Sequence, residues 1–115
     1  MSDTAVNMSV ETLKRVDLVT VNGRIDSSNA AEFEGKLKEL MNNGRHSLVL
    51  NLAGVTYMSS AGLRTLVSTL KECKKRSGDV RLASPSERVA EVLSLAGLDS
   101  LFQVYDDDTA AVGSF

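Results

Sequence analysis

Hydrophobic and polar residues alternate over two short stretches near the start of the chain, residues 8–13 and 16–23. Only Lys14 and Arg15 separate the two stretches, which are rich in Val, Leu and Thr. Alternation with a period of two is typical of strands that bury one face, and so short a connection favours an antiparallel hairpin. We therefore expect the chain to open with a β-hairpin.

The hydrophobic period then changes to that of an α-helix. Apolar residues recur at helical spacing on one face, at Phe33, Leu37, Leu40 and Met41. Asn29 is a good helix-capping residue, and Glu32 stands three positions later, as in a capping box. Gly44 is suited to the end of a helix, so residues 29–44 predict an amphipathic helix with both ends marked.

A buried strand and a second helix follow. Residues 47–52 (SLVLNL) form a near-continuous apolar run, which is typical of a central strand covered on both faces. After a short motif that begins at Tyr57, apolar residues again mark one helical face, at Leu63, Leu66, Val67, Leu70 and Cys73. The cations of the segment KKRSG and then Gly78 indicate where this helix ends.

The last third of the chain predicts a strand at 79–83, a helix and a strand at 101–105. For the helix, Ser84 is the expected cap, Pro85 the first helical residue and Glu87 the partner in a capping box, with Gly97 at the end. Residues 106–115 are compatible with a short final helix or with a frayed end.

The predicted order of elements is β-β-α-β-α-β-α-β, with or without a terminal helix. Strands that alternate with helices indicate an α/β fold with a mixed, mostly parallel β-sheet, here opened by an antiparallel hairpin and packed against α-helices. The 115 residues, 43% of them hydrophobic, suffice for one core and contain no repeat or linker. We expect a single domain over residues 1–115.

Composition excludes several functions. The formal net charge is −2 and no basic stripe is visible, so nucleic acid is not an expected partner. No run of about 18 apolar residues and no secretory signal is present, which predicts a cytoplasmic protein that does not enter a membrane. One Cys and one His permit neither an internal disulfide nor a Cys/His metal cluster. The sequence also lacks the glycine-rich phosphate-binding loop that would indicate a nucleotide cofactor. We expect no cofactor.

Catalysis by this chain is also disfavoured. Nucleophilic catalysis needs a base beside the nucleophile, but His46 precedes the central strand whereas Ser59 and Ser60 follow it, roughly 17–20 Å away for five or six strand residues. Cys73 lies on the apolar face of a helix, where cysteine is usually inert. The acidic run at 106–108 is either a cation ligand or, more often, a solvated charge run. The chain is not expected to be an enzyme.

The motif YMSSAGLR, at positions 57–64, lies where the central strand passes into a helix. A serine there caps the helix, and small residues suit packing of the helix on the sheet. The same place suits a phosphoryl acceptor, because the free N–H groups and dipole of a helix N-terminus stabilise negative charge. Ala61 and Gly62 would also allow another protein's active site to approach closely. Physical reasoning alone leaves both interpretations open.

The residues around this motif resemble those of a known family. The stretch NLAGVTYMSSAGLRTLVSTLKECKK, which begins at Asn51, resembles the central motif of STAS domains, the bacterial anti-sigma factor antagonists. Upstream, VNGRIDSSNAAEFE, which begins at Val21, is similar to their second segment, in which a glycine, an apolar residue and an aspartate precede a helix. The predicted order of elements also fits this family.

The resemblance implies a partner-switching protein that regulates transcription. Such an antagonist binds an anti-sigma factor serine kinase of the histidine-kinase-like ATPase fold and so frees a sigma factor. The kinase phosphorylates a serine of the motif, and a PP2C-type phosphatase removes the phosphate. Carried onto this chain, the acceptor is Ser60, and Asp26 matches an acidic residue expected near it.

The expected partner surface consists of residues around the motif and of Asp26: Asp26, Ser59, Ser60, Ala61, Gly62 and Arg64. For Arg64, a solvated helix charge is an equally good interpretation. Many members of the family have Asp before the acceptor and Ser or Thr after it, where this chain has Ser59 and Ala61, so Ser59 is an alternative acceptor. The family also includes scaffolds and sensory modules that bind a partner or a small ligand without phosphorylation.

Overall fold

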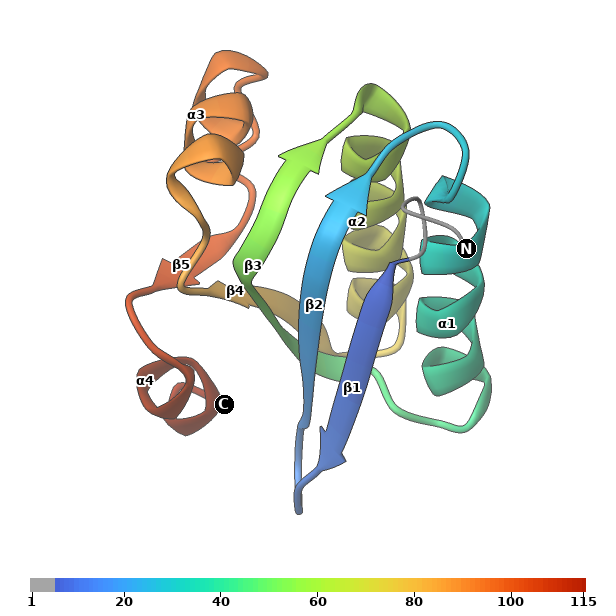
Figure 1. Cartoon of the computed structure of the whole chain (residues 1–115). Helices are drawn as coiled ribbons and strands as arrows, with labels where there is room; N and C mark the ends of the chain where they lie inside the picture. The colour runs from blue at the N-terminus through green and yellow to red at the C-terminus, as the bar shows by residue number, and fades with distance from the viewer. Residues whose placement is uncertain (1–5) are drawn as a thin grey trace.

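Within residues 6–115, which this computed structural model describes, five strands form one mixed sheet and four helices pack against it (Figure 1). The elements are β1 (Asn7–Thr12), β2 (Asp17–Ile25), α1 (Ala30–Asn42), β3 (Ser47–Met58), α2 (Ser60–Lys75), β4 (Asp79–Ala83), α3 (Glu87–Leu95), β5 (Gln103–Tyr105) and α4 (Asp108–Gly113). The strands follow one another across the sheet in chain order. Only β1 and β2 are antiparallel, and every other neighbouring pair is parallel. The predicted fold class is confirmed.

The main hydrophobic core lies between the sheet and the helices α1, α2 and α3. Phe33 and Leu37 of α1, Leu66 of α2 and Leu93 of α3 are almost fully buried against strand residues such as Leu50. Within each helix the buried residues recur every three or four positions, as at Ala30, Phe33, Leu37 and Met41 of α1, which is the spacing of an amphipathic helix on a sheet. Most of the apolar positions predicted from the sequence therefore pack in this core, but Val67 of α2 is only half-buried and lies outside it.

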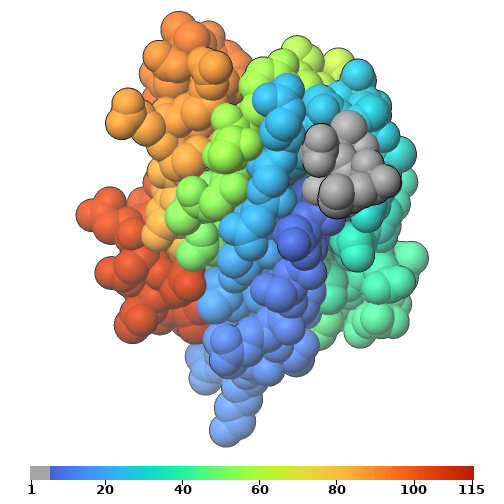
Figure 2. All heavy atoms as spheres, viewed as in Figure 1, coloured from blue at the N-terminus to red at the C-terminus, as the bar shows by residue number. Residues whose placement is uncertain are grey.

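A smaller core lies on the opposite face of the sheet, where α4 packs. It contains Val16, Val49, Ala83 and Ala111, and the ring of Phe115 lies against it. Elsewhere on this face, atoms of β1, β2 and the upper part of β3 lie at the molecular surface (Figure 2). The first half of β3 is thus covered on both faces, which explains its near-continuous apolar run.

Strand β3 is longer than predicted. The apolar run ends at Leu52, but the strand continues to Met58 because its pairing with β2 continues to the Ile25–Met58 pair. At two register shifts within this pairing, β3 has one more residue than β2. Gly54 faces Asn22 across this pairing, and a Cβ atom on it would force the exposed side chain of Asn22 to move. Pairing between strands, rather than local hydrophobicity, sets this end of β3.

The predicted cap of the third helix was wrong. The N-cap of α3 is Ser86, whose Oγ accepts a hydrogen bond from the N–H of Val89 at 3.2 Å. Ser84 instead has a positive φ of 50° and donates its hydroxyl to the carbonyl oxygen of Asp106 at 2.7 Å. Its N–H donates to Tyr105, so Ser84 extends the pairing of β4 with β5 and is not free to cap the helix.

The N-terminus of α1 also differs in detail. Asn29 is the N-cap residue, as expected, but its side chain makes no capping hydrogen bond. It accepts from the N–H of Asp26 at 2.9 Å and donates to the carbonyl of Arg24 at 2.7 Å. Asn29 therefore holds together the loop that joins β2 to α1, which a capping-box pattern does not reveal.

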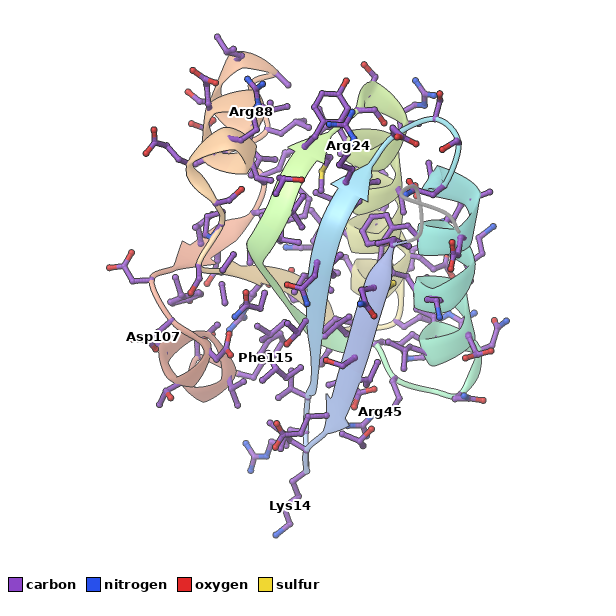
Figure 3. All side chains as sticks on the ribbon, viewed as in Figure 1. Lys14, Arg24, Arg45, Arg88, Asp107 and Phe115 are labelled. Carbon is purple, nitrogen blue, oxygen red and sulfur yellow. The ribbon has the colours of Figure 1, made fainter. Side chains whose placement is uncertain are left out.

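The C-terminal segment forms the helix α4, so the alternative of a frayed end is excluded. Asp107 caps this helix by accepting from the N–H of Ala110 at 2.8 Å. Arg81 of β4 donates to the carbonyl of Ser114 at 2.6 Å and stacks on Phe115, 4.1 Å from the ring centre (Figure 3). These contacts fix the end of the chain against the sheet.

One buried ion pair joins the hairpin to the connection before β3. The side chain of Asp17 is fully buried, and Arg45 donates to its Oδ1 through Nη2 at 2.8 Å and through Nε at 2.9 Å. Arg45 also donates to the carbonyl of Leu13 at 2.8 Å. The second carboxylate oxygen of Asp17 has no hydrogen-bond partner in the described part of the chain, so this carboxylate depends on Arg45.

We expect the substitution Arg45→Met to lower the free energy of unfolding by roughly 2–4 kcal/mol, because it leaves a buried carboxylate without its partner. Urea denaturation measures this change. Lys38→Met is the matched control: it removes the exposed pair between Lys38 and Glu34, 3.5 Å apart, and should change stability by less than about 0.5 kcal/mol. Equal effects of the two substitutions would contradict the interpretation.

Candidate functional site

The carboxyl ends of β2 and β3 lie side by side and bring two loops together. Ile25 pairs with Met58 in parallel register, and the N–H of Ser59 donates to the carbonyl of Ile25 at 2.8 Å. Functional loops of parallel sheets gather at such carboxyl ends. The loop from Asp26 to Asn29 and the start of α2 therefore lie at the same edge of the sheet.

The two motif serines have different environments. Ser59 is the N-cap of α2, and its half-buried hydroxyl accepts from the N–H of Gly62 at 3.3 Å. Ser60 is the first residue of the helix and is exposed, and its hydroxyl makes no hydrogen bond with any residue in the range 6–115. The capping role and the available hydroxyl thus belong to different residues.

Gly62 is buried, and its lack of a side chain serves packing inside the molecule. A Cβ atom at this position would lie 2.8 Å from Cγ2 of Ile25 and 2.9 Å from Cγ of Met58. The glycine therefore lets the first turn of α2 approach the ends of β2 and β3. Ala61 is half-buried and lines a shallow hollow between α1 and α2, whereas Arg64 is exposed.

Asp26 lies in the neighbouring loop and is held by local hydrogen bonds. Its carboxylate accepts from both the backbone N–H, at 2.9 Å, and the hydroxyl of Ser28, and these bonds lower its pKa. The Nε of Arg24 lies 4.0 Å away. The carbonyl of Asp26 accepts from the N–H of Ala30 at 3.0 Å. Asp26 thus shapes the start of α1 with its main chain while its charge stays at the surface.

Sequence reasoning missed two residues next to this loop. The guanidinium of Arg24 lies 4.6 Å from the ring centre of Tyr57, so the last residues of β2 and β3 stack on each other. Figure 3 shows Arg24 at this end of the sheet. No local motif marks the pair, because the two residues become neighbours only through the extended pairing of β2 with β3.

A groove of about 520 Å³ begins at Ser60 and follows α2 toward the end of α3. Leu63 and Val67 of α2 and Leu98, after α3, supply apolar surface, and Arg64 and Lys71 supply charge. The contribution of the segment after α3 was also missed. Leu95 follows Leu93 by two positions and so falls off the apolar face that Val89 and Leu93 define, a sequence signal that could have drawn attention to this segment. Its side chain is 83% exposed.

Residues considered for catalysis lie far from the motif. His46 precedes β3, and the 12 residues of that strand separate it from Ser59 and Ser60 at the other end. Its neighbour Arg45 lies at the opposite end of the sheet from Arg24 (Figure 3). Cys73 is buried in the core, and burial raises the pKa of its thiol to about 11, so the thiol stays protonated near neutral pH.

The acidic run near the C-terminus has local structural roles. Asp107 caps α4, and Asp108 accepts a hydrogen bond from the side chain of Asn51 at 2.7 Å. Across residues 6–115, no group of three or more His, Cys, Asp or Glu side chains is arranged to hold a metal ion. Among the helices described, none is long and apolar enough to cross a bilayer.

Comparisons with known proteins agree with this architecture. The STAS domain family model matches residues 7–111. The chain is 33% identical over 101 residues to the anti-sigma-B factor antagonist of Staphylococcus epidermidis, covering 86% of this chain and 94% of that relative. An anti-sigma factor antagonist from Mycobacterium paratuberculosis superposes with a TM-score of 0.86 at 25% identity, covering 96% of this chain and 93% of the other. Unphosphorylated SpoIIAA, another such antagonist, shares the fold with a TM-score of 0.80 at 18% identity, covering 92% and 93%.

We expect Gly62→Ala to destabilise the domain by roughly 1–2 kcal/mol. The added methyl group overpacks the junction, and the cost of this overpacking exceeds the stability gained from the higher helix propensity of alanine. Gly35→Ala, on the exposed side of α1, is the matched control, since no heavy atom lies within 4 Å of the added methyl group. It should stabilise the domain by about 0.5–1 kcal/mol. Thermal unfolding of both variants measures the difference in sign.

Proposed function

The chain belongs to the STAS domain family of anti-sigma factor antagonists, and on this basis we propose that it binds an anti-sigma factor serine kinase and releases it when Ser60 is phosphorylated. It is a regulatory binding protein rather than an enzyme. In this function the unmodified protein occupies the kinase in the cytoplasm, and a sigma factor otherwise held by that kinase becomes free to direct transcription.

The chemistry belongs to the kinase, which we propose to have the histidine-kinase-like ATPase fold. The Oγ atom of Ser60 attacks the γ-phosphorus of ATP, the bond to the bridging oxygen of ADP breaks, and a base of the kinase takes the hydroxyl proton. A PP2C-type phosphatase then hydrolyses the phosphoserine and restores the binding form. This chain contributes an accessible acceptor and the surface around it.

The observation that carries the proposal is the difference between the two serines. Ser60 is exposed, and its hydroxyl makes no hydrogen bond with the residues described. Ser59 is half-buried and its Oγ accepts from the N–H of Gly62, so its hydroxyl is less accessible to a kinase than that of Ser60. Capping bonds of this kind contribute about 1 kcal/mol, so Ser59 has a structural role that Ser60 does not have.

The position of Ser60 also suits the product. It is the first residue of a 16-residue helix, and a phosphate there lies near free backbone N–H groups and the positive end of the helix dipole. The fold is compatible with such a modification, since SpoIIAA has been solved in a phosphorylated form with a TM-score of 0.75 to this structure. The added charge should therefore act on the bound partner and leave the fold intact.

Incubation with ATP and the serine kinases of the same genome tests the acceptor. Mass spectrometry of peptides should locate one phosphate on Ser60. The signal should be lost in Ser60→Ala and kept in Ser59→Ala, although the latter lowers stability by about 1 kcal/mol through the lost cap. If no cognate kinase modifies the chain while one still binds it, the protein is instead a STAS scaffold that acts without phosphorylation. Phosphate on Ser59 alone would contradict the assignment of Ser60.

A second prediction separates charge from bulk at the same position. Ser60→Asp should weaken the complex with the kinase by tenfold or more, on the order of 1.4 kcal/mol, because a carboxylate enters a close-packed interface. Ser60→Asn, which has nearly the same size without charge, should weaken it much less. Both variants should keep a melting temperature within about 2 °C of the wild type, since the residue is exposed. Unfolding of Ser60→Asp would contradict this picture of the helix start.

A further inference from the structure

Cationic and apolar side chains lie next to each other on the exposed side of α2. The groove that begins at Ser60 meets a second hollow of about 590 Å³ that contains Leu70, Lys75 and Leu101. Lys71 lines both hollows, so the two lie next to each other on the surface of α2. We call this surface the α2 strip and define it by its apolar and cationic members: Leu63, Arg64, Val67, Lys71, Lys75, Leu98 and Leu101.

The charge of the α2 strip is of one sign. Neither hollow is lined by Asp or Glu. Lys74, which also lines the second hollow, pairs with Asp79 at 3.9 Å. Among the ion pairs formed within residues 6–115, none involves Arg64, Lys71 or Lys75. The whole chain has a net charge of −2, so this local excess of positive charge is not a consequence of composition.

The helix dipole does not explain these cations. Lys75 ends the helix, where positive charge is favourable. Arg64, however, stands one turn from the N-terminus, where the dipole disfavours a cation, and Lys71 lies in the interior of the helix. Between these two cations the groove is lined by the polar residue Ser68 and by the half-buried apolar residue Val67.

Apolar residues gather at the same place. Leu101 is 49% exposed, and Leu95, which is 83% exposed, directly precedes Ala96 in the wall of the first hollow. A single exposed leucine needs no explanation, but a group of them beside unpaired cations is typical of an interaction surface. The combination favours a partner that is itself both apolar and acidic.

We propose that the α2 strip binds an acidic amphipathic helix. Apolar side chains at helical spacing would fill the hollows beside Leu63, Val67 and Leu98, and carboxylates beside them would pair with the cations. The protein that contains this acidic helix is identified only through the proposed function, under which the helix is a segment of the serine kinase. The chemistry of the strip itself does not depend on that function.

The α2 strip also explains how phosphorylation would end binding. Ser60 lines the same groove as Arg64 and precedes it by four residues, so the two side chains are neighbours on the helix surface. A phosphate on Ser60 would pair with Arg64 and withdraw one cation from the partner. Its remaining negative charge would repel the carboxylates of the acidic helix.

A peptide titration tests the strip without the kinase. The probe is a synthetic helical peptide of about 14 residues, roughly 21 Å long, with Leu at helical spacing and Glu elsewhere. Its counterpart with Lys in place of Glu is the control. Amide chemical shifts should change at residues 60–75 and 95–101 with the acidic peptide only. Shift changes elsewhere, or equal binding of both peptides, would overturn the proposal.

Charge reversal provides the matched variants. Lys71→Glu/Lys75→Glu should weaken binding of the acidic peptide by about tenfold or more and should reduce its dependence on salt. Lys14→Glu/Lys36→Glu changes the net charge equally at exposed positions outside the strip and should change the affinity less than about threefold. Figure 3 shows Lys14 at the tip of the hairpin, far from α2. Equal effects of the two double variants would overturn the proposal.

Titration of the kinase with the same variants separates this proposal from the proposed function. Loss of kinase binding in Lys71→Glu/Lys75→Glu, but not in the matched control, supports both. A kinase that phosphorylates Ser60 and binds all variants equally overturns the role of the strip and leaves the phosphorylation switch standing. If no kinase binds the wild type, the proposed function fails, and the peptide titration alone decides the chemistry of the strip.

Discussion

The parallel pairing of β2 with β3 up to their carboxyl ends is the constraint on which the rest of the site depends. It places the carbonyl of Ile25 within 2.8 Å of the N–H of Ser59 and so joins the loop that contains Asp26 to the first turn of α2. Gly62 completes the junction, since any larger residue would push α2 away from the strand ends. The exposed position of Ser60 is a consequence of this packing.

Helix α2 begins at this junction, so the motif lies at one end of the surface that the helix exposes. One side of the helix is anchored in the core by Leu66 and Cys73, and the other carries Ser60 and the cations of the α2 strip. A charge added at the N-terminus of α2 therefore acts at one end of this surface. No rearrangement of the fold is needed for a modification at Ser60 to affect binding farther along the helix.

Most elements of this fold were predictable because their signals are local. The apolar period of α1, the continuous run of β3 and the hairpin around Lys14 and Arg15 were identified correctly from the sequence. The errors arose where a distant partner competes for a residue. Ser84 pairs with the β5 region instead of capping α3, and β3 continues past Leu52 because β2 does.

The sequence by itself determined the α/β class, the family resemblance and the motif that contains the candidate acceptor, because composition, periodicity and motif spacing are properties of contiguous segments. Only the tertiary structure assigned the cap to Ser59 and left the hydroxyl of Ser60 available. It also brought Leu98 and Leu101 beside α2, across more than 20 positions of the chain. Such surfaces come from packing between segments, and no pattern within one segment encodes them.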